Sequence, residues 1–355
     1  MLKRNKIALA TGLALLAGSA QAGYTFKINE TDSITFGGYI KVDARYTDGD
    51  VPYRDFWIGS GGGSEDKSQI KLFANESRIN TKFVHGDVTG FIEMDFYGGG
   101  GNEVISNSSN PRMRHAFIKY EKFTFGQTWT TFMNTSSLAE TADFGGPQVA
   151  EAFVRNTLIR YTNGGLELAI ENPETWGSED NPELTPDPAN DDFPDLIAKY
   201  SFKGDWGNVS VAGLARVLNV IDATGDEDTE SAVGISVAGK INVFAKDDIR
   251  FSVSTGNLGR YVGITAATDL YNGEVEESTS VMAAYRHFWT ETVRTSVFFG
   301  NTTTEESDRD RSHYGVNIFK NYTKELSYGF EVGNYVVDDQ DSESLYAQFS
   351  AKYVL

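Results

Sequence analysis

The chain has 355 residues and a formal net charge of −19, and it holds no cysteine. The acidic balance argues against nucleic-acid binding, and the lack of cysteine excludes a disulfide-stabilised exported domain. The mean hydropathy is −0.35, and beyond residue 22 no apolar run approaches the ~20 residues that a membrane helix needs. A chain this polar that still carries 36 Gly, 23 Phe and 17 Tyr is typical of transmembrane β-barrels, in which only every second strand residue must be apolar.

The first 22 residues have the pattern of a secretory signal peptide. A basic start at residues 3–6 precedes an apolar run at 7–17 and an A-x-A cleavage site at 20–22. A membrane anchor would need a longer apolar run. We expect residues 1–22 to be a signal peptide and residues 23–355 to form one domain.

Alternation of apolar and polar residues with a period of two begins near residue 33 and recurs to the last residue. In the final stretch, Leu345, Ala347, Phe349, Ala351 and Tyr353 share one apolar face. The alternation predicts sixteen strands, at residues 33–46, 71–84, 88–97, 112–120, 123–129, 154–162, 166–172, 196–202, 209–217, 233–243, 249–255, 281–289, 293–303, 314–319, 326–332 and 345–355.

Long polar connections alternate with tight turns such as Asn163-Gly164. The long connections include residues 59–68, 98–110, 130–152, 173–194, 222–230 and 258–277, the last with room for a short irregular helix. This asymmetry predicts an all-β, antiparallel transmembrane barrel of about sixteen strands, with short periplasmic turns, long extracellular loops and both termini on the turn side. The last strand would pair with the first to close it.

Charge is divided between loops and wall. The acidic excess lies in the predicted loops, where it either aids solubility or binds divalent cations among lipopolysaccharide phosphates: Glu179, Asp180, Asp187, Asp191, Asp192, Asp226, Glu227, Asp228, Glu230, Glu274, Glu276, Glu277, Asp338, Asp339 and Asp341. The alternation places a basic set on the lumen face: Lys41, Arg45, Arg78, Lys82, Arg112, Arg114, Arg160, Lys199, Arg216, Lys240, Arg250, Arg286 and Arg294. Such a ladder would select anions, unless each member only neutralises a lumen carboxylate such as Asp43, Glu76, Glu93, Asp95, Glu167 or Glu171.

No catalytic or metal-binding pattern is present in the sequence. The four histidines fall in separate hairpins, and neither a nucleophile elbow nor a P-loop occurs. We therefore expect a protein that is not an enzyme and needs no cofactor or metal. Two alternatives stay open: a secreted β-sandwich that binds carbohydrate, and a membrane-embedded hydrolase that uses scattered Ser, His and Asp.

Several short motifs stand out between residues 77 and 173: Ser77-Arg78-Ile79, Gly90 to Phe96, Arg112-x-Arg114-His115-Ala116, Gly126 to Phe132, Asp143-Phe144-Gly145-Gly146-Pro147, Arg155-Asn156, Ile159 to Thr162 and Glu171-Asn172-Pro173. Together they resemble one family, the DcaP-like trimeric porins of Gram-negative outer membranes. The resemblance is dense from about residue 37 to residue 173. It implies a sixteen-stranded barrel, a homotrimer, an inward-folded loop at residues 129–152 that narrows the pore, and passage of small anions such as dicarboxylates.

Two features depart from the family pattern. Some members carry a periplasmic coiled coil before the barrel, where this chain has only residues 23–32, and the last residue is Leu355 where such barrels usually end in Phe. Tyr353 and Leu355 otherwise resemble the terminal signal for barrel assembly.

These observations predict a diffusion porin of the Gram-negative outer membrane, with small anionic solutes, outer-membrane lipid and lipopolysaccharide as partners. The predicted pore-lining residues are Arg45, Arg78, Arg112, Arg114, Arg155, Arg160, Arg216, Arg286, Arg294, Lys41, Lys199 and Asp143. Arg112, Arg114 and Arg160 match the family's basic positions.

Overall fold

The computed structural model describes residues 23–53, 57, 66–177, 191–221, 227–263 and 266–355. The expected signal peptide lies outside the described residues, as do Glu179, Asp180, Asp187 and Asp226 of the acidic loops. None of the described helices is both long enough and apolar enough to span a membrane.

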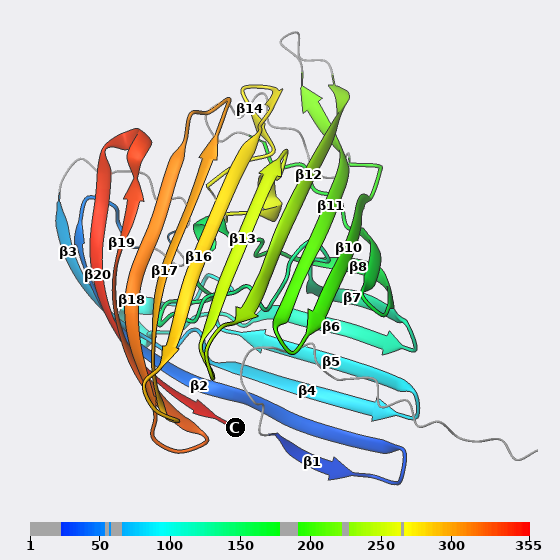
Figure 1. Ribbon diagram of the computed structural model, residues 1–355, viewed down its shortest axis with the longest axis vertical. Coiled ribbons are helices and arrows are strands. Elements are labelled where there is room, and N and C mark those ends of the chain that lie inside the picture. Colours follow the sequence, from blue (N-terminus) through cyan, green and yellow to red (C-terminus); the bar gives the residue numbers. More distant parts are fainter. Residues whose placement is uncertain (1–22, 54–56, 58–65, 178–190, 222–226, 264–265) are drawn as a thin grey trace, which may run out of the picture.

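Within the described residues, sixteen antiparallel strands close into one barrel (Figure 1). The wall consists of β2 (Asp32–Gly49), β3 (Lys67–Phe73) continued by β4 (Arg78–His85), β5 (Val88–Asp95), β6 (Arg112–Tyr120), β7 (Phe123–Trp129), β8 (Arg155–Asn163), β9 (Leu166–Glu171), β10 (Asp195–Gly204), β11 (Gly207–Ile221), β12 (Glu227–Asn242), β13 (Asp248–Gly256), β16 (Ser278–Phe288), β17 (Val293–Thr304), β18 (Asp310–Asn321), β19 (Leu326–Val337) and β20 (Ser342–Val354). The predicted barrel is confirmed, and the sandwich alternative is wrong.

The barrel closes as predicted between its first and last strands. β2 pairs with β20 from Tyr39 opposite Val354 to Gly49 opposite Ser344. Below Tyr39 the edge of β2 is covered by a short strand that the alternation does not indicate, β1 (Tyr24–Lys27), which pairs with residues 33–36. β20 and β1 therefore pair with successive parts of the same edge of β2.

The alternation predicts one strand at residues 71–84, next to β2 in the barrel. The structure has two strands there. β3 ends at Phe73 and β4 begins at Arg78, and a turn closed by the Ser77 amide on the Ala74 carbonyl separates them. β3 pairs with the upper part of β2 and β4 with the lower part. Most other strands match the prediction. Several of them, such as β11, β12 and β19, extend further toward the loops than predicted, because backbone hydrogen bonding between the strands continues beyond the apolar residues.

The outer face is apolar and the inner face polar, as the alternation predicts. On β20 the rings of Phe349 and Tyr353 are about half exposed, while the intervening Gln348 and Ser350 are buried inside the barrel. Lipid-facing strands must be apolar on one face only, so the two-residue period fixes which face is outside.

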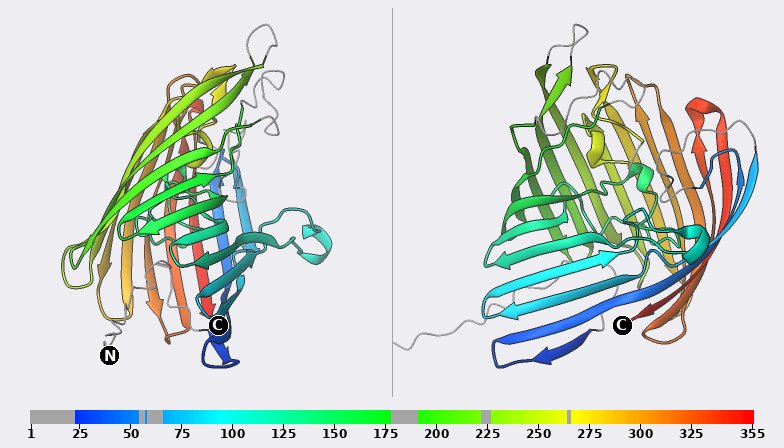
Figure 2. Two further views of the ribbon diagram at one scale, coloured as in Figure 1. Left: turned by 90° about the vertical axis from the view of Figure 1, so that its right-hand side faces the viewer. Right: turned by 180° about the vertical axis from the view of Figure 1, so that it is seen from behind.

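The connections separate the two ends of the barrel. Tight turns, β1 and the C-terminus lie at one end, the turn end, and the longer loops lie at the other, the loop end (Figures 1 and 2). The low wall comprises β4 to β9, with strands of six to nine residues, and the tall wall comprises the barrel strands from β11 to β20, which reach 15 and 16 residues in β11 and β12 (Figure 1).

Short elements lie in the loops. They are α1 (Glu103–Ser106), η2 (Gln148–Ala150), η5 (Gly259–Tyr261), β14 (Leu270–Tyr271), β15 (Glu274–Val275) and η6 (Asp338–Gln340). The loop that carries α1 extends sideways from the barrel (Figure 2). The irregular helix expected within residues 258–277 is the single 3₁₀ turn η5, followed by the β14–β15 hairpin.

Candidate functional site in the lumen

Loop L3, defined here as residues 130–154 between β7 and β8, crosses the interior of the barrel. Its first part follows the wall at β9 and β10. The Thr131 amide donates to Glu171 Oε1 at 2.7 Å, and Lys199 Nζ donates to the Met133 carbonyl at 3.0 Å. Because these contacts bind loop backbone to wall side chains, the start of L3 is held inside the lumen.

The middle of loop L3 is fixed by a carboxylate between arginines of the opposite wall. Glu140 accepts from Arg294 at 2.6 Å and from Arg286 at 3.2 Å, and Arg286 also pairs with Asp248 at 2.5 Å. Burial disfavours the charged form of Glu140, but hydrogen bonds and the charges of Arg294, Arg286 and Arg250 outweigh it and lower its pKa. Glu140 therefore neutralises part of the basic wall.

The tip of L3 lies across the seam where the barrel closes. The Ala142 carbonyl accepts from Lys41 Nζ of β2 at 2.8 Å and from Gln348 Nε2 of β20 at 2.6 Å. On β19, Glu331 accepts from the Ala142 amide at 2.6 Å and from the Asp143 amide at 3.3 Å. Two loop residues thus join three adjacent strands from the inside.

Arg45 of β2 holds the same tip by charge. Its guanidinium pairs with Asp143 at 2.7 Å and donates to Gln348 at 2.7 Å. It also lies over the rings of Tyr53 and Tyr346, at 4.1 and 4.7 Å from their centroids. With an exposed fraction of 1%, Arg45 is enclosed by its partners.

The return path of loop L3 packs on the tall wall and on a second inward loop. Thr302 of β17 donates to the Val149 carbonyl in η2 at 2.6 Å. Ala152 forms a β-bridge with Val262 of loop L6, defined here as residues 257–277. L3 and L6 therefore contact each other inside the barrel and share one apolar cluster.

Loop L6 is tied to the wall by a four-residue charge network. Arg216 of β11 pairs with Asp195 of β10 at 3.1 Å and with Asp269 of L6. Arg260 of L6 pairs with the other oxygen of Asp195 at 3.1 Å. The charges balance, so this network fixes the loop without leaving surplus charge.

A smaller network lies nearer the turn end, between the low wall and β10. Glu167 pairs with Lys199 at 2.8 Å and lies 3.8 Å from Arg160, whose Nε donates to Thr131 Oγ1 at 2.7 Å. Arg160 and Lys199 thus contribute mainly to holding the start of L3.

Four arginines gather near the loop end of the low wall: Arg78 of β4, Arg112 and Arg114 of β6, and Arg155 of β8. A β-bulge shapes this group, because the register between β5 and β6 shifts at Glu93/Met94. The inward direction predicted for Arg112 and Arg114 depends on this shift, because alternation continued from the outward Tyr120 without it would put both arginines on the outer face. The extra residue lets both arginines turn into the lumen.

Two carboxylates of β5 partly neutralise this arginine cluster. Asp95 accepts two bonds from Arg112, at 3.0 and 2.7 Å, and one from Arg114 at 3.0 Å. Glu93 accepts from Arg114 at 2.9 Å, with Arg78 at 3.9 Å. Among the described residues, four guanidinium groups face these two carboxylates, so the cluster keeps a surplus of positive charge.

Arg155 carries the clearest part of that surplus. Its guanidinium lies 4.7 Å from the centroid of the Trp129 ring, which Arg114 also contacts at 5.7 Å. Among the described residues no carboxylate forms an ion pair with Arg155, and its Nη1 has no hydrogen-bond partner although it is buried. A cation held only by an aromatic face retains its capacity to bind an anion.

The twelve predicted residues therefore separate into three groups. The arginine cluster contains Arg78, Arg112, Arg114 and Arg155; the contacts of loop L3 with β2 and the tall wall use Lys41, Arg45, Asp143, Arg286 and Arg294; and the charge networks of the low wall and loop L6 use Arg160, Lys199 and Arg216. Their role as pore-lining residues stays a prediction.

Sequence reasoning missed several residues of the lumen. Glu140, Glu331, Trp129 and Tyr53 each contact a predicted residue, and Arg260 is linked to the predicted Arg216 through Asp195. Glu331 could have been found, because it is a carboxylate at an inward position of a predicted strand. Glu140 and Tyr53 lie in loops, where no period indicates direction.

The acidic residues of the loop end form an open hollow. Asp308, Asp310, Asp338 and Asp339 line it together with Ser307. Burial and the nearby charges of Asp310 and Glu343 raise the pKa of Asp338. In the described part of the chain, no group of three or more His, Asp or Glu side chains is arranged to hold a metal ion.

A closed sixteen-stranded barrel with an apolar outer face, a charged lumen and an inward-folded loop defines an outer-membrane channel of the porin type. The model of the DcaP outer membrane protein family matches residues 29–318, and the chain belongs to that family. It therefore resides in the outer membrane of a Gram-negative bacterium, and family and fold point to a channel rather than an enzyme.

Solved structures agree with this fold at low sequence identity. The outer membrane channel DcaP of Acinetobacter baumannii superposes with a TM-score of 0.78 at 20% identity, over 93% of this chain and 99% of that chain. The anion-selective porin of Comamonas acidovorans gives 0.58 at 10% identity, over 91% and 100%. The trimer form of OmpT from Vibrio cholerae gives 0.56 at 13% identity, over 92% and 100%. No curated protein sequence matches the chain.

Proposed function

We propose that the chain forms a diffusion channel for small hydrophilic anions, with a preference for dicarboxylate-like solutes, and that it assembles as a homotrimer. The observation that carries the anion preference is Arg155, a half-buried cation with no ion-pair partner among the described residues beside three further arginines. An anion passing this cluster gains charge-assisted hydrogen bonds that a cation does not.

More than one cationic side chain of the cluster is within reach of a solute, which favours a solute with two carboxylates. Asp95 and Glu93 pair with Arg112, Arg114 and Arg78, and Arg155 has no carboxylate partner among the described residues. Arg78 and Arg112 keep about a quarter of their side-chain surface exposed and are therefore accessible to a solute. The structurally similar Comamonas porin is anion-selective, which supports the same assignment.

The trimeric state is supported by OmpT of Vibrio cholerae, a structurally similar protein that has a trimer form. The solutes, the outer-membrane lipid and lipopolysaccharide are the partners we assign to the lumen, the apolar outer face and the acidic loop end. Cross-linking of the detergent-extracted protein would test the trimer, because a homotrimer gives a three-chain band and a monomer gives none.

The selectivity is tested in a planar bilayer with a salt gradient. The wild-type channel should give a reversal potential that favours anions. Arg155→Gln should reduce that preference and weaken block by a dicarboxylate about tenfold, as expected for one lost charge-assisted hydrogen bond. Lys246→Gln removes the same charge from an exposed turn and should leave both values unchanged. A cation preference of the wild-type channel would contradict the proposed selectivity.

A further inference from the structure

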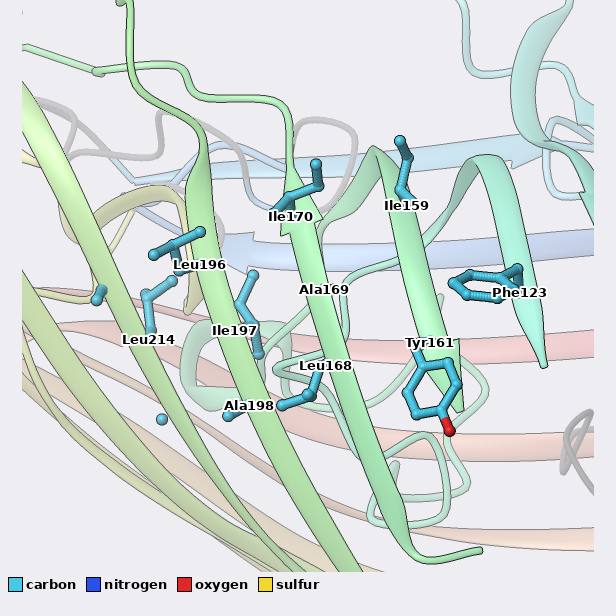
Figure 3. A pocket seen from close by; sticks show the side chains of 12 residues that line it. Phe123, Ile159, Tyr161, Leu168, Ala169, Ile170, Leu196, Ile197, Ala198 and Leu214 are labelled. Atoms are coloured by element: carbon cyan, nitrogen blue, oxygen red, sulfur yellow. The ribbon is translucent and has the colours of Figure 1, made fainter. Parts of the chain in front are cut away.

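A hollow of about 650 Å³ lies on the outer face of the barrel over β8 to β11 (Figure 3). Its floor is made by small outward residues, Ala198 of β10 with Gly213 and Ala215 of β11, on two strands that pair directly. Larger outward side chains, among them Ile170, Leu196 and Tyr161, rise around them. The hollow is therefore a groove between tall apolar side chains rather than a gap in the wall.

The surface of the hollow is almost wholly apolar, and its position in the membrane is fixed by its neighbours. Phe123 and Tyr161, whose ring centroids are 5.4 Å apart, stand at its lower edge beside the turns. Aromatic side chains at this height mark the boundary of the hydrocarbon layer. The hollow therefore opens to the periplasmic leaflet.

A cation lies directly at this end of the hollow. Lys122, in the turn between β6 and β7, lies with its ammonium 5.8 Å from the Tyr161 ring centroid and donates to Asn163 Oδ1 at 3.0 Å. Glu121 precedes it in the turn, so the turn carries no net charge. What distinguishes the site is the placement of the ammonium against a ring that lines the hollow.

We propose that this hollow binds one phospholipid of the periplasmic leaflet, with an acyl chain in the groove and the phosphate on Lys122. An unfilled groove would deprive its lining of dispersion contacts, and an acyl chain restores them. A basic side chain at the boundary of the hydrocarbon layer attracts the phosphate of the lipid headgroup, while the acyl chain lies in the apolar groove. The alternative occupant is a second copy of the chain, but the packing of a second copy on this groove would not require a basic side chain that binds phosphate.

The test is native mass spectrometry of the detergent-extracted protein after delipidation, with dioleoyl phosphatidylglycerol or dioleoyl phosphatidylethanolamine added. Wild-type protein should retain about one lipid per chain. Gly213→Leu fills the floor of the hollow and should weaken retention of both lipids at least tenfold. A Cβ added at Gly213 meets no atom within 4 Å and would point into the hollow, so the variant should fold.

The matched control is Gly90→Leu, a substitution on β5 at another outward glycine, where an added Cβ makes only ordinary contact with Phe83. It should retain lipid like the wild type. Lys122→Gln should weaken retention of both phospholipids, because both carry the phosphate. Heat-dependent gel mobility confirms that each variant is folded, and Ala198→Leu replaces Gly213→Leu should the latter fail.

Three results would overturn the proposal. One is undiminished lipid retention in the folded Gly213→Leu variant, and another is no effect of Lys122→Gln. The third is a disulfide-linked dimer formed in membranes by Gly213→Cys, which would assign the hollow to a second copy. The natural chain has no cysteine, so such a dimer could form only through the introduced thiol.

Discussion

Arg45 and Asp143 form an ion pair of 2.7 Å that joins strand β2 to the tip of loop L3, and both side chains are buried. Burial disfavours the charged form of Asp143, but Arg45 outweighs this and lowers the pKa of that carboxyl. Removing one partner of a buried pair leaves the other uncompensated, which makes this contact more costly to break than a surface pair.

Asp143→Asn should therefore destabilise the barrel by about 3 kcal/mol and release the tip of L3. Single-channel recordings should show larger and noisier openings, because the loop no longer holds one position across the seam. The control is Glu291→Gln, which breaks the exposed pair with Lys246 and should change stability by less than about 1 kcal/mol. Equal effects of the two substitutions would contradict a special role for the Arg45–Asp143 pair.

A second prediction concerns the carboxylate that neutralises the tall wall. Glu140→Gln removes the charge between Arg286 and Arg294, and Arg286 keeps only Asp248 as an acidic partner among the described residues. The reversal potential should shift toward stronger anion preference, opposite in sign to the shift expected for Arg155→Gln. A shift toward cations would show that the two arginines do not face the conducting path.

Much of the barrel can be predicted from the sequence because lipid imposes one local rule on every strand. Residues such as Phe349 and Tyr353 must face outward, and a two-residue period then assigns every neighbour. The break at residues 74–77 and the bulge beside Arg114 escape that rule, since the first is a turn closed by its own backbone hydrogen bond and the second a register shift that interrupts the two-residue period.

The candidate site is less predictable because its contacts join distant parts of the chain. Ala142 contacts Gln348, and Arg155 stands against Trp129 at the opposite end of loop L3. An arginine at an inward position can be recognised from the alternation, but whether it is neutralised depends on these long-range partners. The sequence thus identifies the candidate arginines, but only the folded structure distinguishes Arg45, which is paired with Asp143, from Arg155, which has no ion-pair partner among the described residues.

The third prediction is a pH dependence caused by Glu151 in loop L3. This carboxylate is buried, accepts from the Ala139 amide at 3.3 Å, and has a pKa raised well above its usual value by burial. An acid whose pKa is higher in the folded state binds more protons there, so its contribution to stability falls as pH rises above about 4. Protonation of Glu151 therefore favours the docked loop.

Glu151→Gln should remove that dependence. The stability of the variant minus that of the wild type should increase with pH from about 4 upward, by at most about 1.4 kcal/mol per pH unit until the folded-state pKa is reached. Urea unfolding midpoints of the two proteins between pH 4 and pH 8 provide the measurement. A difference that is constant over this range would show that Glu151 titrates alike in the folded and unfolded chains.

The register at the closing seam gives the last prediction. Val42 of β2 and Ala351 of β20 are directly opposite, and both point outward. Directly opposed strand residues lie within the Cα separation that a disulfide bridges. Because the chain has no other cysteine, the double variant Val42→Cys/Ala351→Cys should form an internal disulfide on oxidation. Oxidised protein should then keep its folded gel mobility to a higher temperature than reduced protein, because the seam cannot open. The offset pair Val42→Cys/Leu345→Cys should not cross-link, and an efficient disulfide there would contradict the observed register.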